Sequence, residues 1–391
     1  MEPVFLVASV RAYVLCGAMD CCLAKRRGAQ EYCNHESDPG ATTAASCEMK
    51  AATITLAEPA ETGALGVQQL KRLWSRAILQ RQGQPAIASA EAHVEHVVLD
   101  ALGMGLEQTM QHLFRAVPSF AEFEQWIIQT TGGVSATQVA RINAMLTGAE
   151  CPPEIARWLA EVEADAPVLS AADVAFWDEH GYVIVQDAVP EASRAAATQA
   201  ILNHVGATLE EPESWYKPND HGIMVQFFQH PAFMANRQAR RVHKAFAQLW
   251  KTADLWVSTD RAGFNVPERP GWKFRGPHLH WDVSLARPIP FGTQGILYLT
   301  DTEPEQGALT LVPSFHRRLD AWLDRLPGGT DPRQQDLHAL GSIPIAGRAG
   351  NLIIWHHALP HGSSPNHATR PRIVQYINMR PARMEIRESW I

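Results

Sequence analysis

Two histidines and one aspartate on predicted strands are the side chains of this sequence best suited to metal chemistry. His280 and Asp282 stand two positions apart within residues 276–282, which read GPHLHWD. Alternate residues of a strand point to the same face, so this spacing predicts that the imidazole and the carboxylate reach one point. His361 follows a predicted buried strand over 351–355 and offers a second imidazole. The sequence therefore indicates a site assembled from distant parts of the chain.

Two histidines and one carboxylate are a ligand set that suits non-heme Fe(II) oxygenases. They occupy one face of an octahedral metal ion and leave three positions open for a bidentate co-substrate and O₂. Arg372, eleven residues after His361, opens an apolar segment over 373–379. Its guanidinium offers a rigid fork for the far carboxylate of a dicarboxylic 2-oxo acid, which a lysine would match less well.

Other interpretations of the same residues remain open. His280, Asp282 and His361 could form a polar cluster that satisfies its own charges without a metal. That arrangement is costly, because ionisable side chains on inward strand faces need partners once they leave water. The residues also fit a cupin-type metalloenzyme that uses no 2-oxo acid, in which Arg372 would be dispensable.

The elements that must position these residues are short strands separated by turns. A capped helix comes first, because Ser170 and Asp173 form a variant capping box and Gly181 ends the helix. Helical segments are predicted over 193–205 and 236–249, and strands over 182–185, 255–259, 280–285, 295–300, 307–312, 351–355 and 373–379. Short strands punctuated by Gly and Pro, without regular βαβ alternation, favour a sandwich or jelly roll. We therefore predict an α+β protein with a cupin-like jelly roll (double-stranded β-helix) and flanking helices over 167–391.

A small all-helical domain is predicted before this core, over 51–166. Its first helix carries an apolar stripe at positions 70, 73, 74, 77 and 78 and ends near residue 83. Further helices are predicted over 88–102, 106–116, 120–130, 135–146 and 153–162, with Ser135 as an N-cap. The histidines of this segment have no acidic partner at ligand spacing and are interpreted as structural. The sequence does not indicate what this domain does.

Residues 1–50 differ from the rest, and we interpret them as a disordered or mis-assigned N-terminal extension with Met49 as an alternative start. Their apolar stretch is short and lacks the positive start of a secretory signal. A metal cluster is conceivable there, but its spacing matches no zinc pattern. The residues concerned are Cys21, Cys22, Cys33 and His35.

The overall composition fits a globular protein. Of 391 residues, 46% are hydrophobic and 19% are charged, and the net charge is −7. A mild acidic excess argues against nucleic-acid binding, and no apolar run reaches the ~18 residues of a membrane helix. Five of the six cysteines lie within the first 48 residues, so the rest has no disulfide framework, as is typical of the cytoplasm. We expect a cytoplasmic protein with neither nucleic-acid nor membrane partners; its oligomeric state is not indicated.

Over residues 169–381 the sequence resembles the phytanoyl-CoA dioxygenase family of Fe(II)/2-oxoglutarate-dependent oxygenases. The resemblance lies in four segments that follow in the family's order: residues 170–190, the HWD at 280–282, residues 298–316, and HGSSPN with the later RPR at 361–372. It implies that His280, Asp282 and His361 are iron ligands and that Ser363 and Arg372 hold the distal carboxylate of 2-oxoglutarate. Tyr298 would lie near the co-substrate. The implied cofactors are Fe(II), 2-oxoglutarate and O₂, with ascorbate helpful in vitro.

The resemblance implies hydroxylation of a C–H bond in a small molecule, with release of succinate and CO₂. Asp282 stands where halogenating relatives carry a small residue, so oxygen insertion is expected. One alternative is a non-catalytic jelly roll that binds a ligand, with the helical domain mediating interactions. Another is an oxygenase of the same class that gives desaturation or ring formation. Candidate substrate contacts precede the HWD: Trp215, Lys217, His221, Gln226, Trp256, Arg261, Asn265, Trp272, Lys273 and Arg275.

Overall fold

The structure is a computed structural model that describes residues 54–84, 89–217, 221–387 and 389–391. The predictions for residues 1–50, including the alternative start and the Cys/His cluster, lie outside the described residues. No helix among the described residues is long and apolar enough to cross a membrane.

Helices form the first half of the described chain, close to the predicted positions. They are α3 (Leu70–Arg81), α4 (Ser89–Ala101), α5 (Leu106–Ala116), α6 (Phe120–Thr131), α7 (Ala136–Thr147) and α8 (Pro153–Ala164). Ser135 caps α7 as predicted, because its side chain accepts a hydrogen bond from the backbone N–H of Gln138. The apolar stripe of α3 enters a shared core with Leu99, Phe123 and Ile127.

The helical part is joined to the rest of the chain by shared cores. Trp256 from β3 (Trp256–Val257) packs into the core of these helices. In the other direction, Val162 of α8 belongs to the core beneath the sheet. An independently folding domain over 51–166 therefore stays a prediction.

Antiparallel sheets build the second half of the chain, as expected for an α+β protein. The large sheet has the order β1-β8-β5-β10-β4-β2 and the small sheet β7-β6-β9, while β3 pairs with β11 (Met379–Arg380). The large-sheet strands are β1 (Tyr182–Val185), β2 (Met224–Val225), β4 (Ala262–Asn265), β5 (Thr293–Tyr298), β8 (Leu352–His356) and β10 (Arg372–Tyr376). The small-sheet strands are β6 (Leu309–Leu311), β7 (Ile343–Ile345) and β9 (His361–Ser363).

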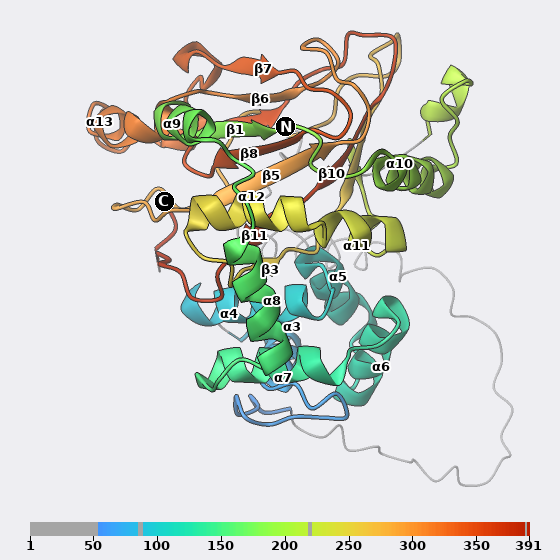
Figure 1. The fold of residues 1–391 in the computed structure, drawn as a ribbon, viewed down its shortest axis with the longest axis vertical. Helices are drawn as coiled ribbons and strands as arrows, with labels where there is room; N and C mark the ends of the chain where they lie inside the picture. The colour runs from blue at the N-terminus through green and yellow to red at the C-terminus, as the bar shows by residue number, and fades with distance from the viewer. Residues whose placement is uncertain (1–53, 85–88, 218–220, 388) are drawn as a thin grey trace, which may run out of the picture.

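The two sheets face each other across one apolar layer, with β6 and β7 lying above β8 and β5 in Figure 1. Ile296 and Ile353 of the large sheet pack in this layer with Leu311 and Ile345 of the small sheet. Alternate residues of the same strands, such as Leu297 and Ile354, face the opposite way and join the second core. This period of two is what a sheet covered on both faces requires.

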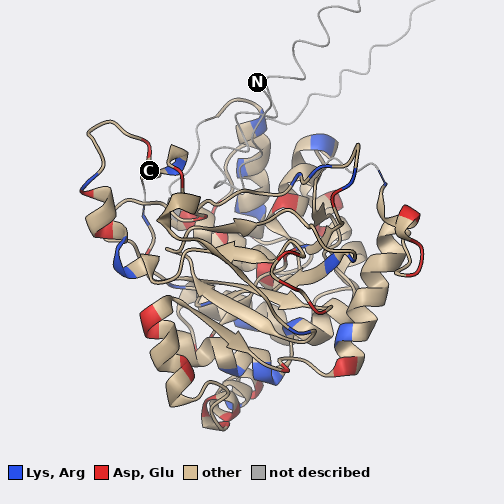
Figure 2. Cartoon of the chain, turned by 90° about the horizontal axis from the view of Figure 1, so that it is seen from above, with Lys and Arg blue, Asp and Glu red and all other residues tan. Residues whose placement is uncertain are grey.

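Helices cover the outer face of the large sheet. α12 (Arg240–Trp250) and α11 (Pro231–Arg237) lie between the sheet and the N-terminal helices, and α10 (Glu191–Val205) lies beside them (Figure 1). The predicted helix before β1 is α9 (Ala171–His180), which carries the expected Ser170–Asp173 capping box. In Figure 2 the central strands are mostly uncharged, whereas acidic and basic residues are interspersed on the helices and loops around them.

Three sequence predictions of secondary structure are wrong. The strand expected over 373–379 is two strands, β10 and β11, which belong to different sheets. The helix expected over 236–249 is two helices, α11 and α12, which are separated at residues 238–239. The strand expected over 280–285 is a single β-bridge at His280 followed by irregular chain. Its backbone carbonyls are occupied differently, because the guanidinium of Arg333 donates to the carbonyls of Trp281 and Val283. These carbonyls are therefore satisfied without a neighbouring strand.

Candidate metal and co-substrate site

The backbone brings the two histidines of the candidate site directly opposite each other. His280 and His361 form an antiparallel bridge in which each backbone N–H donates to the other's carbonyl, at 2.9 and 3.0 Å. Gly362 makes this approach possible, because a Cβ there would lie 2.5 Å from the carbonyl oxygen of His278. Residues 81 positions apart in sequence thereby become neighbours across a ladder.

Three ligand atoms converge at this point. One donor atom each from His280, Asp282 and His361 lies within 4.8 Å of the others, and this is the metal-binding group found among the described residues. The Nε2 atom of His280 is 3.3 Å from Oδ1 of Asp282, and that of His361 is 3.2 Å from Oδ2. The structure therefore brings the predicted ligand set together, although residues 281–285 do not form a strand.

Hydrogen bonds turn both imidazoles toward the same place. Nδ1 of His280 is 2.7 Å from the carbonyl oxygen of His278, and Nδ1 of His361 is 3.1 Å from that of Leu359. Carbonyls only accept, so each Nδ1 carries the proton and each Nε2 presents a lone pair in the neutral ring. Two lone pairs that face a carboxylate repel unless a cation lies between them. The donor set thus fits a metal ion of the kind that binds two imidazoles and one carboxylate.

The carboxylate of Asp282 is held through one oxygen and leaves the other unused. Its Oδ2 accepts a hydrogen bond from Nε2 of Gln294 at 2.6 Å, and the Gln294 amide oxygen accepts from the indole N–H of Trp355 at 3.1 Å. Its Oδ1 is buried and accepts no hydrogen bond from the described residues. Buried acceptors are normally satisfied, so an unpaired carboxylate oxygen between two imidazoles fits a metal ligand.

The pKa values of Asp282 and His280 reflect the short distance between their side chains. Burial opposes ionisation of Asp282, but the facing His280 and His361 hold the pKa of its carboxyl well below its usual value. Burial likewise opposes protonation of His280, but the negative charge of Asp282, whose Oδ1 lies 3.3 Å away, raises the pKa of its imidazole. Each of the two groups therefore stabilises the charged form of the other.

Arg372 is the second unusual charge of the site. Its side chain is fully buried at the start of β10, and both terminal nitrogens lie 3.4 Å from Oγ of Ser363. Its Nε has no hydrogen-bond partner, and no described carboxylate lies within 4.0 Å of the guanidinium. A buried cation that lacks an anion is costly, so this position fits an incoming carboxylate. Ser363 and His361 are alternate residues of β9, which places the hydroxyl on the same face as the imidazole.

Tyr298 joins the two sheets. Its hydroxyl donates to the carbonyl of Ile345 in β7 at 2.8 Å and accepts from the backbone N–H of Leu309 in β6 at 3.0 Å. Burial raises the pKa of this fully enclosed phenol to about 12, despite the nearby Arg372. Because its proton is already donated, Tyr298 could serve a co-substrate only as a packing surface.

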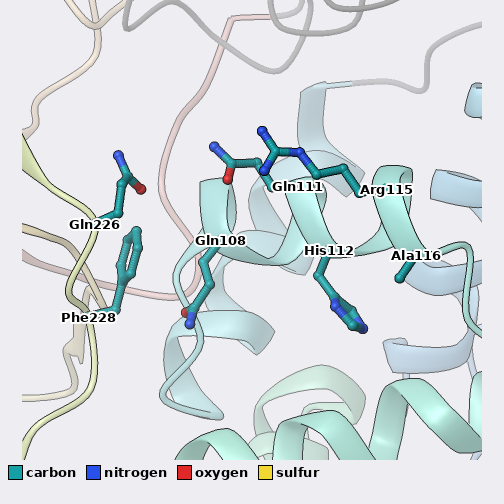
Figure 3. Close-up of a pocket in the computed structure, with 7 residues that line it drawn as sticks. All are labelled: Gln108, Gln111, His112, Arg115, Ala116, Gln226 and Phe228. Carbon is teal, nitrogen blue, oxygen red and sulfur yellow. The ribbon is translucent and has the colours of Figure 1, made fainter. Parts of the chain in front are cut away.

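Two cavities lie near the strands that carry these residues. The first, of about 320 Å³, lies between α5 and the chain after β2 and is lined by Gln108, Gln111, His112, Arg115, Ala116, Gln226 and Phe228 (Figure 3). None of the three candidate metal ligands lines either cavity. The second, of about 340 Å³, includes Asn265, which pairs with Arg372 across β4 and β10.

Most of the predicted substrate contacts line the second cavity. They are Trp215, Lys217, His221, Gln226, Asn265, Trp272, Lys273 and Arg275. The other two lie elsewhere. Trp256 is buried in the core of the N-terminal helices beneath the guanidinium of Arg141, and Arg261 pairs with Glu107 and Asp260.

Sequence reasoning missed Gln294 and Trp355, which hold Asp282 in place. The signal was present but weak: Gln294 is a polar residue within the otherwise apolar strand β5, on the register position opposite Trp355 of β8. A glutamine at such a position needs a buried partner, but sequence alone does not say which.

An antiparallel sandwich that carries two histidines, one aspartate and an unpaired buried arginine defines the class of metal-dependent, cupin-like oxygenases. The sequence model of the family described as Phytanoyl-CoA dioxygenase (PhyH) matches residues 177–374. The match spans half of the chain, and the chain belongs to this family of Fe(II)/2-oxoglutarate-dependent oxygenases. The resemblance inferred from the sequence is thereby confirmed, and with it the cofactors Fe(II) and 2-oxoglutarate.

Individual relatives are distant. A putative phytanoyl-CoA dioxygenase from Dictyostelium discoideum is 21% identical, with 53% of this chain and 74% of that protein covered. An ectoine dioxygenase from Bordetella parapertussis is 23% identical, with the same shares covered. Among solved structures, iron-bound EctD from S. alaskensis is 20% identical over 57% of this chain and 81% of that chain, with a TM-score of 0.39. The carbocyclase SnoK from nogalamycin biosynthesis is 18% identical over 57% and 90%, with a TM-score of 0.40.

Proposed function

We propose that this protein hydroxylates a C–H bond of a small organic molecule, consuming 2-oxoglutarate and O₂ and releasing succinate and CO₂. The observation that carries the proposal is the presence of two charged groups that the protein pairs only in part. Oδ1 of Asp282, which lies in a group with two imidazoles, accepts no hydrogen bond from the described residues. The buried Arg372 faces no carboxylate among the described residues. Iron and a dicarboxylic co-substrate supply these two partners.

Each residue has a defined task in this proposal. His280, Asp282 and His361 hold Fe(II), and the Nδ1–H bonds to backbone carbonyls fix the two imidazoles for that purpose. Arg372 and Ser363 bind the distal carboxylate of 2-oxoglutarate, and the ring of Tyr298 packs beside them. Bound iron and 2-oxoglutarate supply the activation of O₂ and the oxidation of the C–H bond. All six residues lie within 167–391, which we propose as the catalytic domain, with the helices of 51–166 as a separate domain.

Asp282 supports hydroxylation over halogenation. A carboxylate on the metal occupies the position that a halide would need, so transfer of oxygen to the substrate is the expected outcome. Desaturation and ring formation use the same ligand set, and analysis of the product separates them from hydroxylation.

Succinate release tests the proposal. The full chain is incubated with Fe(II), ascorbate, 2-oxoglutarate and a panel of small organic acids, alcohols and amines in air, and succinate is quantified. We expect iron-dependent succinate release with the wild-type protein and none with His361→Ala, whose unfolding temperature is measured in parallel. If neither Fe(II) nor 2-oxoglutarate raises the unfolding temperature of the wild-type protein and no panel member gives succinate, the non-catalytic ligand-binding interpretation is correct instead.

A further inference from the structure

We propose that the cavity of about 340 Å³ between β4 and the segment preceding His280 binds the substrate, and that it selects a small organic acid with a planar apolar body. This inference rests on the proposed function and adds the chemical class of the molecule that is oxidised. The cationic group that recognises the acid is Arg275.

The position of the cavity connects it to the candidate metal site. Asn265 on its wall pairs with Arg372 across β4 and β10. Phe274 and Arg275 also line it, and two residues later the carbonyl of Pro277 accepts a hydrogen bond from the backbone N–H of Ser363 at 3.0 Å. The chain therefore passes directly from the cavity wall to the strand that carries His361 and Ser363.

The charges around the cavity are of one sign. Its described lining contains Lys217, Lys273 and Arg275 but no aspartate or glutamate. The first two are partly engaged: Lys217 donates to the carbonyls that end α10, and Lys273 lies 3.9 Å from Glu268. Arg275, by contrast, is exposed at the rim of the cavity, has no described carboxylate within 4.0 Å and makes no hydrogen bond among the described residues. An arginine in this state is available to bind a carboxylate through two nitrogens.

The walls between these charges are aromatic and fixed. Trp215 is buried, and its indole N–H donates to the carbonyl of Thr208. Trp272 packs edge-on against Tyr216, with ring centroids 5.5 Å apart. Rings that are held in this way offer flat apolar surface at little entropic cost. A volume of about 340 Å³ lies at the small end of ligand cavities, which suits a small acid.

A matched pair of probes tests the inference by binding alone. We would titrate 3-phenylpropanoate and its neutral analogue 3-phenylpropanamide into the full chain loaded with Ni(II) and saturated with 2-oxoglutarate, using calorimetry. Saturation keeps the probe from Arg372. We expect the acid to bind at least about 10-fold more tightly than the amide, because one charge-assisted contact is worth that factor. In Arg275→Gln the two probes should bind within about twofold of each other, as expected when that contact is lost.

Controls separate this inference from a general charge effect. Arg115→Gln removes an arginine from the other cavity and should leave the preference for the acid unchanged. Trp272→Leu should weaken both probes while their ratio stays the same. Equal binding of acid and amide to the wild-type protein, or an equal effect of Arg115→Gln and Arg275→Gln, would overturn the proposal.

The result is distinguishable from a failure of the proposed function. Binding of Ni(II) and 2-oxoglutarate is measured first, by the shift in unfolding temperature. If both bind but the acid is not preferred, only the substrate class is wrong. If neither binds, the proposed function fails, and the Arg275-dependent preference is still decided by the same titration without them.

Discussion

Two of the regions in which the described residues bury charged side chains pair those charges in opposite ways. Where α4 meets β3 and β11, Asp100 accepts hydrogen bonds from the guanidinium of Arg380 and from the backbone N–H of Thr259. Within the helices, Arg76 pairs with Glu95. In the β-sandwich, Arg372 is equally buried but meets only the hydroxyl of Ser363, and Oδ1 of Asp282 accepts no hydrogen bond.

The difference distinguishes charges that are paired within the protein from charges that are paired only in part. A buried carboxylate that contacts an arginine has its charge compensated within the protein, and the pair joins two parts of the chain. A buried arginine and a buried carboxylate that do not contact each other each need another group to compensate their charge. In our proposal these groups are 2-oxoglutarate and iron. Even so, burial outweighs the attraction of Arg380 and raises the pKa of Asp100 to about 6, so complete pairing does not remove the cost of desolvation.

The largest effect should come from breaking the complete pair. Asp100→Ala leaves Arg380 buried and without its carboxylate, which is expected to lower the free energy of unfolding by about 3–5 kcal/mol. Urea denaturation measures the change, and Asp100→Asn, which retains an acceptor for Thr259, should lose less. Unchanged stability in Asp100→Ala would mean that this pair does not hold the helices to the sheet.

Removing the charge of Arg372, which has no carboxylate partner among the described residues, should not lower the stability of the protein. Arg372→Met eliminates a buried cation without a carboxylate partner, so the metal-free and co-substrate-free protein should unfold at the same or a higher temperature. The 2-oxoglutarate concentration for half-maximal succinate release should rise roughly 100-fold, because two charge-assisted hydrogen bonds are lost. An unaltered 2-oxoglutarate requirement would favour the cupin-type reaction that uses no 2-oxo acid.

The amide that holds Asp282 offers a smaller and more specific test. Gln294→Leu removes the hydrogen bond to Oδ2 and should weaken metal binding about 10-fold, the lower range for residues that orient a ligand. Metal affinity is followed by competition with a chelator. Trp355→Phe, which frees the Gln294 carbonyl but leaves the amide in place, should have a lesser effect.

The mildest perturbation is a change of pH. Because the pKa of His280 is raised in the metal-free protein, its proton must leave before the imidazole binds a metal. Metal affinity should therefore increase with pH, by at most about tenfold per unit, until the pH passes the raised pKa of His280. The low pKa of Asp282 keeps its carboxylate ionised throughout this range. An affinity that falls as the pH rises from 6 to 8 would contradict this order of events.

Much of the architecture could be predicted from local patterns. The six N-terminal helices follow from apolar periodicity and caps such as Ser135, and the Ser170–Asp173 capping box fixed the start of α9. Long-range pairing could not be predicted in the same way. The segment over 280–285 has strand-like composition, but Arg333 occupies its carbonyls, and that contact depends on a loop about 50 residues away.

The sequence by itself determined which ligand types are available, because His280, Asp282, His361 and Arg372 follow from residue type and spacing. Only the tertiary structure decided which charges remain unpaired. Nothing in the spacing of Arg372 and Arg380 says that one meets a carboxylate and the other does not. Whether an arginine meets a carboxylate depends on segments far apart in the chain, because packing brings residues together that are not neighbours in the sequence.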